Sequence, residues 1–187
     1  IRLNIHFETE KLAHPSLPLI PGHEIVGRVV GTGAKVTGAS VGMRVGVPWL
    51  ASTCGVCDDC RHGRENLCDS ATFTGYDRNG GYAEYCTADA RFCFELPDTA
   101  APALAPLLCA GLIGYRSLRL AGDAQRIGIY GFGAAAHLLA QVATAQGREV
   151  LAFTRSGDAA AQALAVSVGC SWAGGADELP PQPLDAA

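Results

Sequence analysis

The sequence predicts two folds in series, a mainly β region followed by the start of an α/β unit with a parallel sheet. Three observations lead to this prediction. Short apolar runs broken by glycine and proline fill residues 1 to about 100, four cysteines gather within residues 54–68, and a strand–glycine turn–helix pattern starts near residue 127. We expect one domain over residues 1–108 and a second over residues 109–187.

The strands of the first region are short. Residues 22–36 combine Val and Ile with three glycines and predict a strand with bends, as in a small curved barrel. A second strand is expected at residues 43–47. Two more are expected at residues 80–86 and 91–97, which completes a mainly β domain.

The character of the sequence changes after Pro97. Residues 102–121 are apolar at helical spacing and predict one or two helices. A strand, a glycine turn, a helix and a second strand are then expected across residues 127–153, followed by an Ala-rich helix over residues 157–168. This βαβα order is typical of a parallel sheet.

Composition excludes some classes of partner. A net charge of −4 and a pI near 5.7 argue against nucleic acid or an anionic membrane. No apolar run approaches the roughly 18 residues of a membrane span, and no signal peptide opens the chain. Eight cysteines without an export signal predict a reducing, cytoplasmic setting. The chain opens without Met and closes at LDAA, so we expect a fragment of a longer protein.

Four cysteines are spaced closely enough to bind one metal ion. The run CGVCDDCRHGRENLC holds them at Cys54, Cys57, Cys60 and Cys68. Zinc takes four thiolates in a tetrahedron, and spacers this short let one loop supply all of them. The binding energy of the metal then folds the loop.

Two other readings of the cysteine run compete with zinc. Disulfides are one, although thiols two residues apart pair poorly. An iron–sulfur cluster is the other, since it also uses CxxCxxC. Its usual run places the fourth cysteine sooner and follows it with proline, whereas Asp69 follows Cys68 here.

A glycine turn predicts a dinucleotide site. Gly131, Gly133 and Ala136 form GxGxxA directly after a predicted strand and at the start of a predicted helix. The first glycine permits the tight turn, the second lets the backbone approach a pyrophosphate, and the small third residue lets helix pack on strand. The helix N-terminus offers amides to the phosphates. A tightly packed turn without a ligand is the alternative.

The choice between NAD and NADP is read about 20 residues further on. An acidic residue at the end of the second strand takes the ribose hydroxyls of NAD, but this chain has Thr154 and Arg155 there. Arg155 can accept a 2′-phosphate, which keeps NADP open beside NAD. A solvated loop arginine is the other interpretation.

These features, in this order, resemble the zinc-containing medium-chain alcohol dehydrogenase family. The family hallmark GHExxG reads GHEIVG at residues 22–27. PLLCAGLIGYRSL at residues 106–118 and YGFGAAAH at residues 130–137 extend the resemblance, which is nearest to bacterial members with a GFGAAAH turn. The resemblance implies a GroES-like β domain followed by a Rossmann domain.

The resemblance also implies roles for single residues. His23 and Cys109 correspond to ligands of a catalytic zinc, and Glu24 lies close to that metal in relatives. The four clustered cysteines correspond to a structural zinc site. Arg2 matches a residue that holds the cofactor pyrophosphate, and His6 matches one that relays the alcohol proton.

Three positions depart from the family pattern at the start of the chain. Ile1 stands where a cysteine ligand of the catalytic zinc belongs, and isoleucine cannot bind a metal. Leu3 replaces the hydroxyl that accepts the substrate proton, and Asn4 replaces the carboxylate that orients the zinc-bound histidine. Either the protein has lost catalysis, or its first residues differ from the natural sequence.

The implied function is hydride transfer between a small alcohol or aldehyde and NAD(P), in a protein that forms homo-oligomers at full length. The missing ligand predicts an impaired enzyme. Two alternatives stay open, a zinc-independent NADPH reductase of the same superfamily and an inactive relative. A zinc ribbon that binds nucleic acid is disfavoured by the acidic balance.

Overall fold

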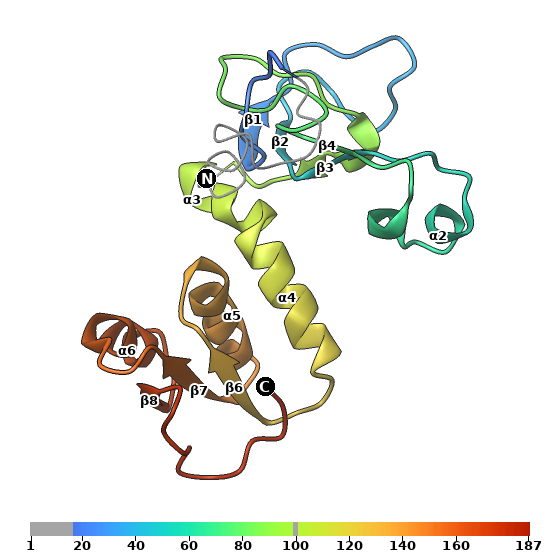
Figure 1. Cartoon of the computed structure of the whole chain (residues 1–187). Helices are drawn as coiled ribbons and strands as arrows, with labels where there is room; N and C mark the ends of the chain where they lie inside the picture. The colour runs from blue at the N-terminus through green and yellow to red at the C-terminus, as the bar shows by residue number, and fades with distance from the viewer. Residues whose placement is uncertain (1–16, 99–100) are drawn as a thin grey trace. The chain divides into compact units, whose positions relative to one another are not determined.

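The computed structural model describes residues 17–98 and 101–187 and divides into two compact units (Figure 1). The first unit is Ile1–Cys109 and the second is Ala110–Ala187. Among the described residues, no helix combines the length and the apolar character that crossing a membrane requires.

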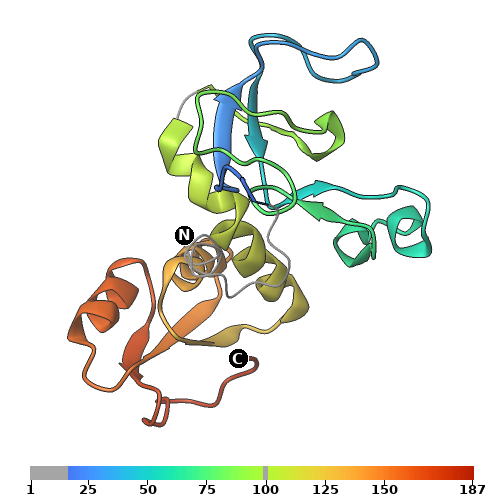
Figure 2. The ribbon, with the colours of Figure 1, turned by 45° about the horizontal axis from the view of Figure 1, so that its top comes forward.

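The first unit is built on a small antiparallel sheet. Its strands are β1 (Ile25–Arg28), β2 (Arg44–Val47) and β5 (Phe94–Glu95), in the order β1-β2-β5. Figure 2 shows β1 and β2 side by side. In their antiparallel ladder, Ile25 lies opposite Val47. Gly46 in β2 leaves room for the Leu108 side chain to pack on the sheet, because a Cβ at this position would lie 2.7 Å from it.

A second, two-stranded sheet carries the cysteine lobe, which we define as residues 54–68. Strands β3 (Leu50–Ser52) and β4 (Thr72–Phe73) are antiparallel and flank the lobe on its two sides in the sequence. Two short helices, α2 (Asp58–Arg61) and η1 (Glu65–Leu67), form within it. The side chains of Ser52 and Thr72 hydrogen-bond at 2.6 Å and close the stem.

The strand expected at residues 80–86 is wrong. The Gly80 and Gly81 amides donate instead to the carbonyls of Ile20 and Gly22, at 2.6 and 3.0 Å. A Cβ on Gly80 would lie only 2.0 Å from the Gly22 carbonyl oxygen, so this glycine pair allows a close backbone crossing where a ladder was expected. The strand expected at residues 91–97 shrinks to β5, because the 3₁₀ helix η2 (Ala90–Phe92) precedes it.

The helical segment that follows is divided into three helices. The helices α3 (Ala101–Leu104) and η3 (Ala105–Leu108) end the first unit, and α4 (Ala110–Leu120) begins the second. Pro106 occupies the first turn of η3, where its missing amide costs nothing. Cys109 follows η3 with non-helical backbone angles, which separate η3 from α4.

The second unit confirms the predicted α/β order. The elements are β6 (Arg126–Tyr130), α5 (Ala134–Ala145), β7 (Glu149–Thr154), α6 (Ala159–Ser167) and β8 (Trp172–Gly175). The three strands are parallel, in the order β6-β7-β8. Its buried core joins all of these layers and includes Leu118, Ile127, Ile129, Ala140, Ala143, Val150, Ala152, Ala165 and Cys170.

The last residues of the chain run along the free side of β6. Ala186 bridges Ile127 in parallel, and the Gly128 amide donates to the Ala186 carbonyl at 2.8 Å. The order across the sheet is therefore β8, β7, β6 and then this segment. From β6 the chain first adds β7 and β8 on one side and then returns to the other side of β6, so the strand order reverses there. In open parallel sheets, ligands bind at the carboxyl ends of the strands at such a reversal.

Candidate functional site

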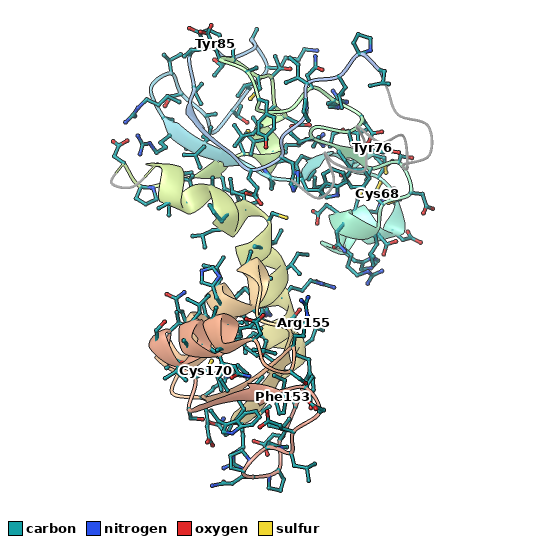
Figure 3. The ribbon with its side chains drawn as sticks, turned by 60° about the vertical axis from the view of Figure 1, so that its left-hand side comes forward. Cys68, Tyr76, Tyr85, Phe153, Arg155 and Cys170 are labelled. Atoms are coloured by element: carbon teal, nitrogen blue, oxygen red, sulfur yellow. The ribbon has the colours of Figure 1, made fainter. Side chains whose placement is uncertain are left out.

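The cysteine lobe brings its four thiols together. All four sulfur atoms lie within 4.8 Å of one another, and Cys54 Sγ is 3.9 Å from Cys60 Sγ and 3.6 Å from Cys68 Sγ. Zinc–thiolate bonds of about 2.3 Å give a tetrahedron with edges of about 3.8 Å, so the spacing fits one zinc ion. Cys68 is the buried member and lies beside the short helices of the lobe (Figure 3).

The thiols of the lobe are free, and backbone amides surround one of them. A disulfide needs sulfurs about 2.0 Å apart, which none of these pairs approaches. The amides of Val56 and Cys57 donate to Cys54 Sγ at 3.5 and 3.3 Å. These backbone hydrogen bonds lower the pKa of the Cys54 thiol to about 6, which favours the thiolate that a metal requires.

A second group of residues that can bind a metal joins two distant parts of the first unit's sequence. His23, Glu24 and Cys109 place one ligand atom each within 4.8 Å of the others. His23 Nε2 lies 3.4 Å from Cys109 Sγ, although the two residues are 86 positions apart. Their side chains converge because His23 lies two residues before β1, while Cys109 ends η3, which packs on the same sheet.

Burial sets the protonation of this group. Desolvation lowers the pKa of His23, with partial opposition from the charge of Glu24, so the imidazole is kept neutral with a lone pair to give. Burial also raises the pKa of the Cys109 thiol, and the Glu24 carboxylate adds to that rise. A neutral imidazole and a thiol whose deprotonation needs a nearby cation fit a divalent metal.

His23 has one buried ring nitrogen to which no described residue hydrogen-bonds. Its Nδ1 makes no hydrogen bond to any residue from 17 to 98 or from 101 to 187. Metal-binding histidines hold their second ring nitrogen by a hydrogen bond to a carboxylate, carbonyl or water. The resemblance assigns that role to position 4, and Asn4 lies outside the described residues, as do Ile1, Arg2, Leu3 and His6.

Aromatic side chains form a wall beside His23. The Trp49 ring contacts the His23 ring edge-on, with 5.3 Å between the ring centroids. It also stacks on the Phe73 ring, with a centroid distance of 4.7 Å, and the centroid of the Tyr76 ring lies 6.2 Å from that of Trp49. Sequence reasoning missed Trp49. The available signal was a bulky tryptophan just after a predicted strand and five residues before the first cysteine of the lobe.

The glycine turn in the second unit is open. Gly131 has φ +85°, a backbone conformation that favours glycine, and Gly133 precedes the first residue of α5. A Cβ at either glycine would meet no atom within 4 Å, so both face space that a ligand can enter. The first amides of α5 have no acceptor within the helix. Ala136 packs against the core, as a small residue there requires.

The two residues at the end of β7 differ in their surroundings. Thr154 is 2% exposed, and its hydroxyl lies within hydrogen-bond distance of the Gly174 carbonyl and of the Gln162 amide, both at 3.2 Å. Arg155 is exposed, and its guanidinium makes no hydrogen bond or ion pair with the described residues. Arg155 is therefore free to meet a ligand, whereas the hydroxyl of Thr154 already has protein partners.

Comparison with known proteins gives consistent results. Residues 2–98 match the alcohol dehydrogenase GroES-like domain family. A probable alcohol dehydrogenase AdhA of Mycobacterium tuberculosis (strain CDC 1551 / Oshkosh) is 47% identical over 100% of this chain and 56% of its own length. An alcohol dehydrogenase of Geobacillus stearothermophilus is 46% identical over 74% of this chain and 42% of its own length.

Solved structures share the arrangement. The NADP(H) complex of CAD from Helicobacter pylori has a TM-score of 0.83 at 28% identity, over 92% of this chain and 53% of that one. A cobalt- and zinc-bound alcohol dehydrogenase of Pyrobaculum aerophilum has a TM-score of 0.81 at 26% identity, over 91% and 53%. The chain spans about half the length of the curated relatives it matches. It belongs to the zinc-type medium-chain alcohol dehydrogenase family, with a GroES-like domain followed by a partial parallel sheet.

Proposed function

We propose that this protein is an NAD(P)-linked alcohol dehydrogenase with a structural zinc in the cysteine lobe and an impaired catalytic metal centre at His23 and Cys109. The observation that carries the proposal is the 3.4 Å approach of His23 Nε2 to Cys109 Sγ. Two half-buried metal-type ligands from distant parts of the sequence have no structural need to meet at this distance.

The residues of the site divide the work. His23 and Cys109 would hold the metal, with the Glu24 carboxylate beside them, and Arg2 and His6 keep the pyrophosphate and proton-relay roles that the family implies. A zinc ion held there would supply Lewis-acid chemistry to the alcohol oxygen, and a bound nicotinamide cofactor would supply the hydride acceptor. The Trp49 wall next to His23 orients the carbon skeleton of a small alcohol or aldehyde and keeps water away from it.

The cofactor binds along the second unit. Gly131 and Gly133 leave room for the pyrophosphate, and the N-terminus of α5 directs its free amides at it. The small side chain of Ala136 keeps α5 close to the sheet. Arg155, exposed at the end of β7, lies where the ribose 2′ position is read, and Thr154 positions that strand end through its hydroxyl.

Ile1 supports the impaired state and also favours the alternative. Catalytic zinc sites have three protein ligands and an open position, and position 1 does not supply one. A zinc-independent NADPH reductase of the same superfamily is the second candidate. The homo-oligomer and the cytoplasmic setting remain predictions, tested by size-exclusion chromatography and by cell fractionation.

An alcohol-oxidation assay tests the proposed function. Ethanol, butanol and benzyl alcohol are offered with NAD and with NADP, with added zinc, to the full chain and to Cys109→Ser. We expect slow alcohol-dependent formation of reduced nicotinamide that Cys109→Ser abolishes, while Cys86→Ser, an exposed cysteine outside both clusters, retains it. Turnover that Cys109→Ser leaves unchanged would favour the zinc-independent reductase, and no alcohol-dependent turnover would contradict the proposal.

A further inference from the structure

A carboxylate from the loop after β8 reaches the loop after β7. Thr154 and Gly175 are opposite each other in the parallel ladder, and the Ala176 amide donates to the Thr154 carbonyl at 2.8 Å. Immediately beyond these strand ends, the Ser156 hydroxyl hydrogen-bonds to the Asp177 carboxylate. The two loops are therefore joined at the carboxyl edge of the sheet.

Gly175 shows how closely the acidic groups lie over this edge. A Cβ on Gly175 would lie 2.5 Å from Asp177 Oδ1, 3.0 Å from Glu178 Oε1 and 3.1 Å from Ser156 Oγ. The Gly175 amide also donates to Glu178 Oε1 at 2.7 Å. Both carboxylates are thus held against the strand end by hydrogen bonds.

The charges at this edge favour a neutral ligand group over an anionic one. The hydrogen bond from Ser156 lowers the pKa of Asp177, so its carboxylate is ionised at neutral pH. Neither Asp177 nor Glu178 forms an ion pair with the described residues. Arg155, next to Ser156 in the sequence, is one basic side chain against these two acidic ones.

The position of this acidic pair matters because of the sheet order. The strand order reverses between β6 and the C-terminal segment that Ala186 joins to it. In sheets of this kind a dinucleotide binds at the carboxyl ends beside the reversal, and its adenosine ribose is read at the end of the second strand, which is β7 here. An acidic residue usually stands there in the second strand itself. This chain has Thr154, Arg155 and Ser156 instead. The acidic residue is Asp177 of the loop after β8, which the hydrogen bond from the Ser156 hydroxyl holds beside this strand end.

We propose that Asp177, held by Ser156, is the residue that determines specificity for NAD, accepting hydrogen bonds from the ribose hydroxyls and repelling a 2′-phosphate. The inference deepens the proposed function and rests on it. Asp177 and Arg155 have opposite effects on cofactor choice, because Arg155 alone would favour NADP.

Binding measurements separate the two contributions without relying on turnover. Isothermal titration calorimetry of the full chain with NAD and with NADP gives the ratio of their dissociation constants. We expect the wild type to bind NAD more tightly and Asp177→Asn to shift the ratio toward NADP about tenfold or more, as loss of a hydrogen bond to a charged group implies. Ser156→Ala, which releases Asp177, is expected to shift it in the same direction.

Controls keep the outcomes distinct. Asp123→Asn removes an exposed carboxylate elsewhere in the same unit, and it should leave the ratio unchanged while altering net charge equally. Circular dichroism verifies that each variant is folded. Tighter binding of NADP by the wild type, or an unchanged ratio in Asp177→Asn, overturns the inference while the proposed function stands. No binding of either dinucleotide to the folded wild type contradicts both.

Discussion

His23 Nε2 and Cys109 Sγ lie 3.4 Å apart although 86 positions separate the residues in the sequence. The contact is set by the short β1–β2 sheet, because His23 leads into β1 and η3 packs on β2 just before Cys109. The first unit thus holds a four-thiol group on the β3–β4 sheet and the His23–Cys109 pair beside the β1–β2–β5 sheet.

Replacement of the buried Cys68 thiol should abolish zinc binding by the cysteine lobe. In Cys68→Ser, the hydroxyl is a poor ligand for zinc, so we expect the bound zinc of the lobe to be lost and the lobe to become sensitive to protease. A colorimetric zinc-release assay and limited proteolysis measure this. Cys86→Ser serves as the matched control, and equal zinc retention in the two variants would refute a metal role for Cys68.

The two glycines of the turn should respond differently to alanine. Gly131→Ala places a side chain at φ +85° and should cost about 1–2 kcal/mol in the free energy of unfolding. Gly133→Ala has ordinary backbone angles and open space, so its stability should be unchanged while dinucleotide affinity falls. Chemical denaturation and calorimetry with NAD measure the two effects. Undiminished affinity in Gly133→Ala would argue against a pyrophosphate at this turn.

The aromatic wall should govern the use of larger alcohols. Trp49→Ala removes the ring that contacts His23 and stacks on Phe73, so kcat/KM for benzyl alcohol should fall about tenfold, the scale of one aromatic contact. Trp49→Phe keeps a ring and should retain most of the activity. Equal kcat/KM values in the two variants would place the substrate away from Trp49.

Acid should weaken the second unit through two carboxylates. Arg126 pairs with Glu149 at 2.6 Å, and the amides of Gln125 and Arg126 donate to Asp185. The pKa of Glu149 is lowered by the hydrogen bond from Arg126, and that of Asp185 by the two amides.

The direction of the pH effect follows from these lowered pKa values. The stabilisation is complete above the usual values of 4.5 and 3.8, and it is lost as pH falls through the folded-state values. The thermal midpoint should therefore drop on acidification, and less steeply in Asp185→Asn than in Asp123→Asn. Parallel pH profiles in the two variants would show that Asp185 contributes nothing.

The sequence predicted those parts of the fold that local pattern determines. The strand, glycine turn, helix and strand across residues 127–153 are confirmed as β6, α5 and β7, because apolar periodicity and glycine punctuation act within short stretches. The strand expected at residues 80–86 was wrong, since Gly80 and Gly81 contact backbone some 60 positions earlier in the sequence. No local sequence pattern predicts such a close approach of two distant backbone segments.

The residues of the candidate sites also fall into those that local spacing predicts and those that depend on distant contacts. The cysteine cluster and the glycine turn follow from spacing, and the pairing of His23 with Cys109 was implied only by family resemblance. Trp49 and Asp177, for which we propose roles, were missed because each is placed by a contact with a distant part of the sequence, His23 in one case and Ser156 in the other. Neither contact leaves a motif.

Zinc content per chain tests the central claim most directly. It is measured by inductively coupled plasma mass spectrometry after dialysis against a weak chelator, for the wild type, Ile1→Cys and the control Ile1→Ala. If the lobe is a complete site and the His23–Cys109 centre lacks the ligand that position 1 should supply, the wild type and Ile1→Ala will hold one zinc ion and Ile1→Cys will hold two. Two tightly bound zinc ions in the wild type, or no second ion in Ile1→Cys, would contradict this account.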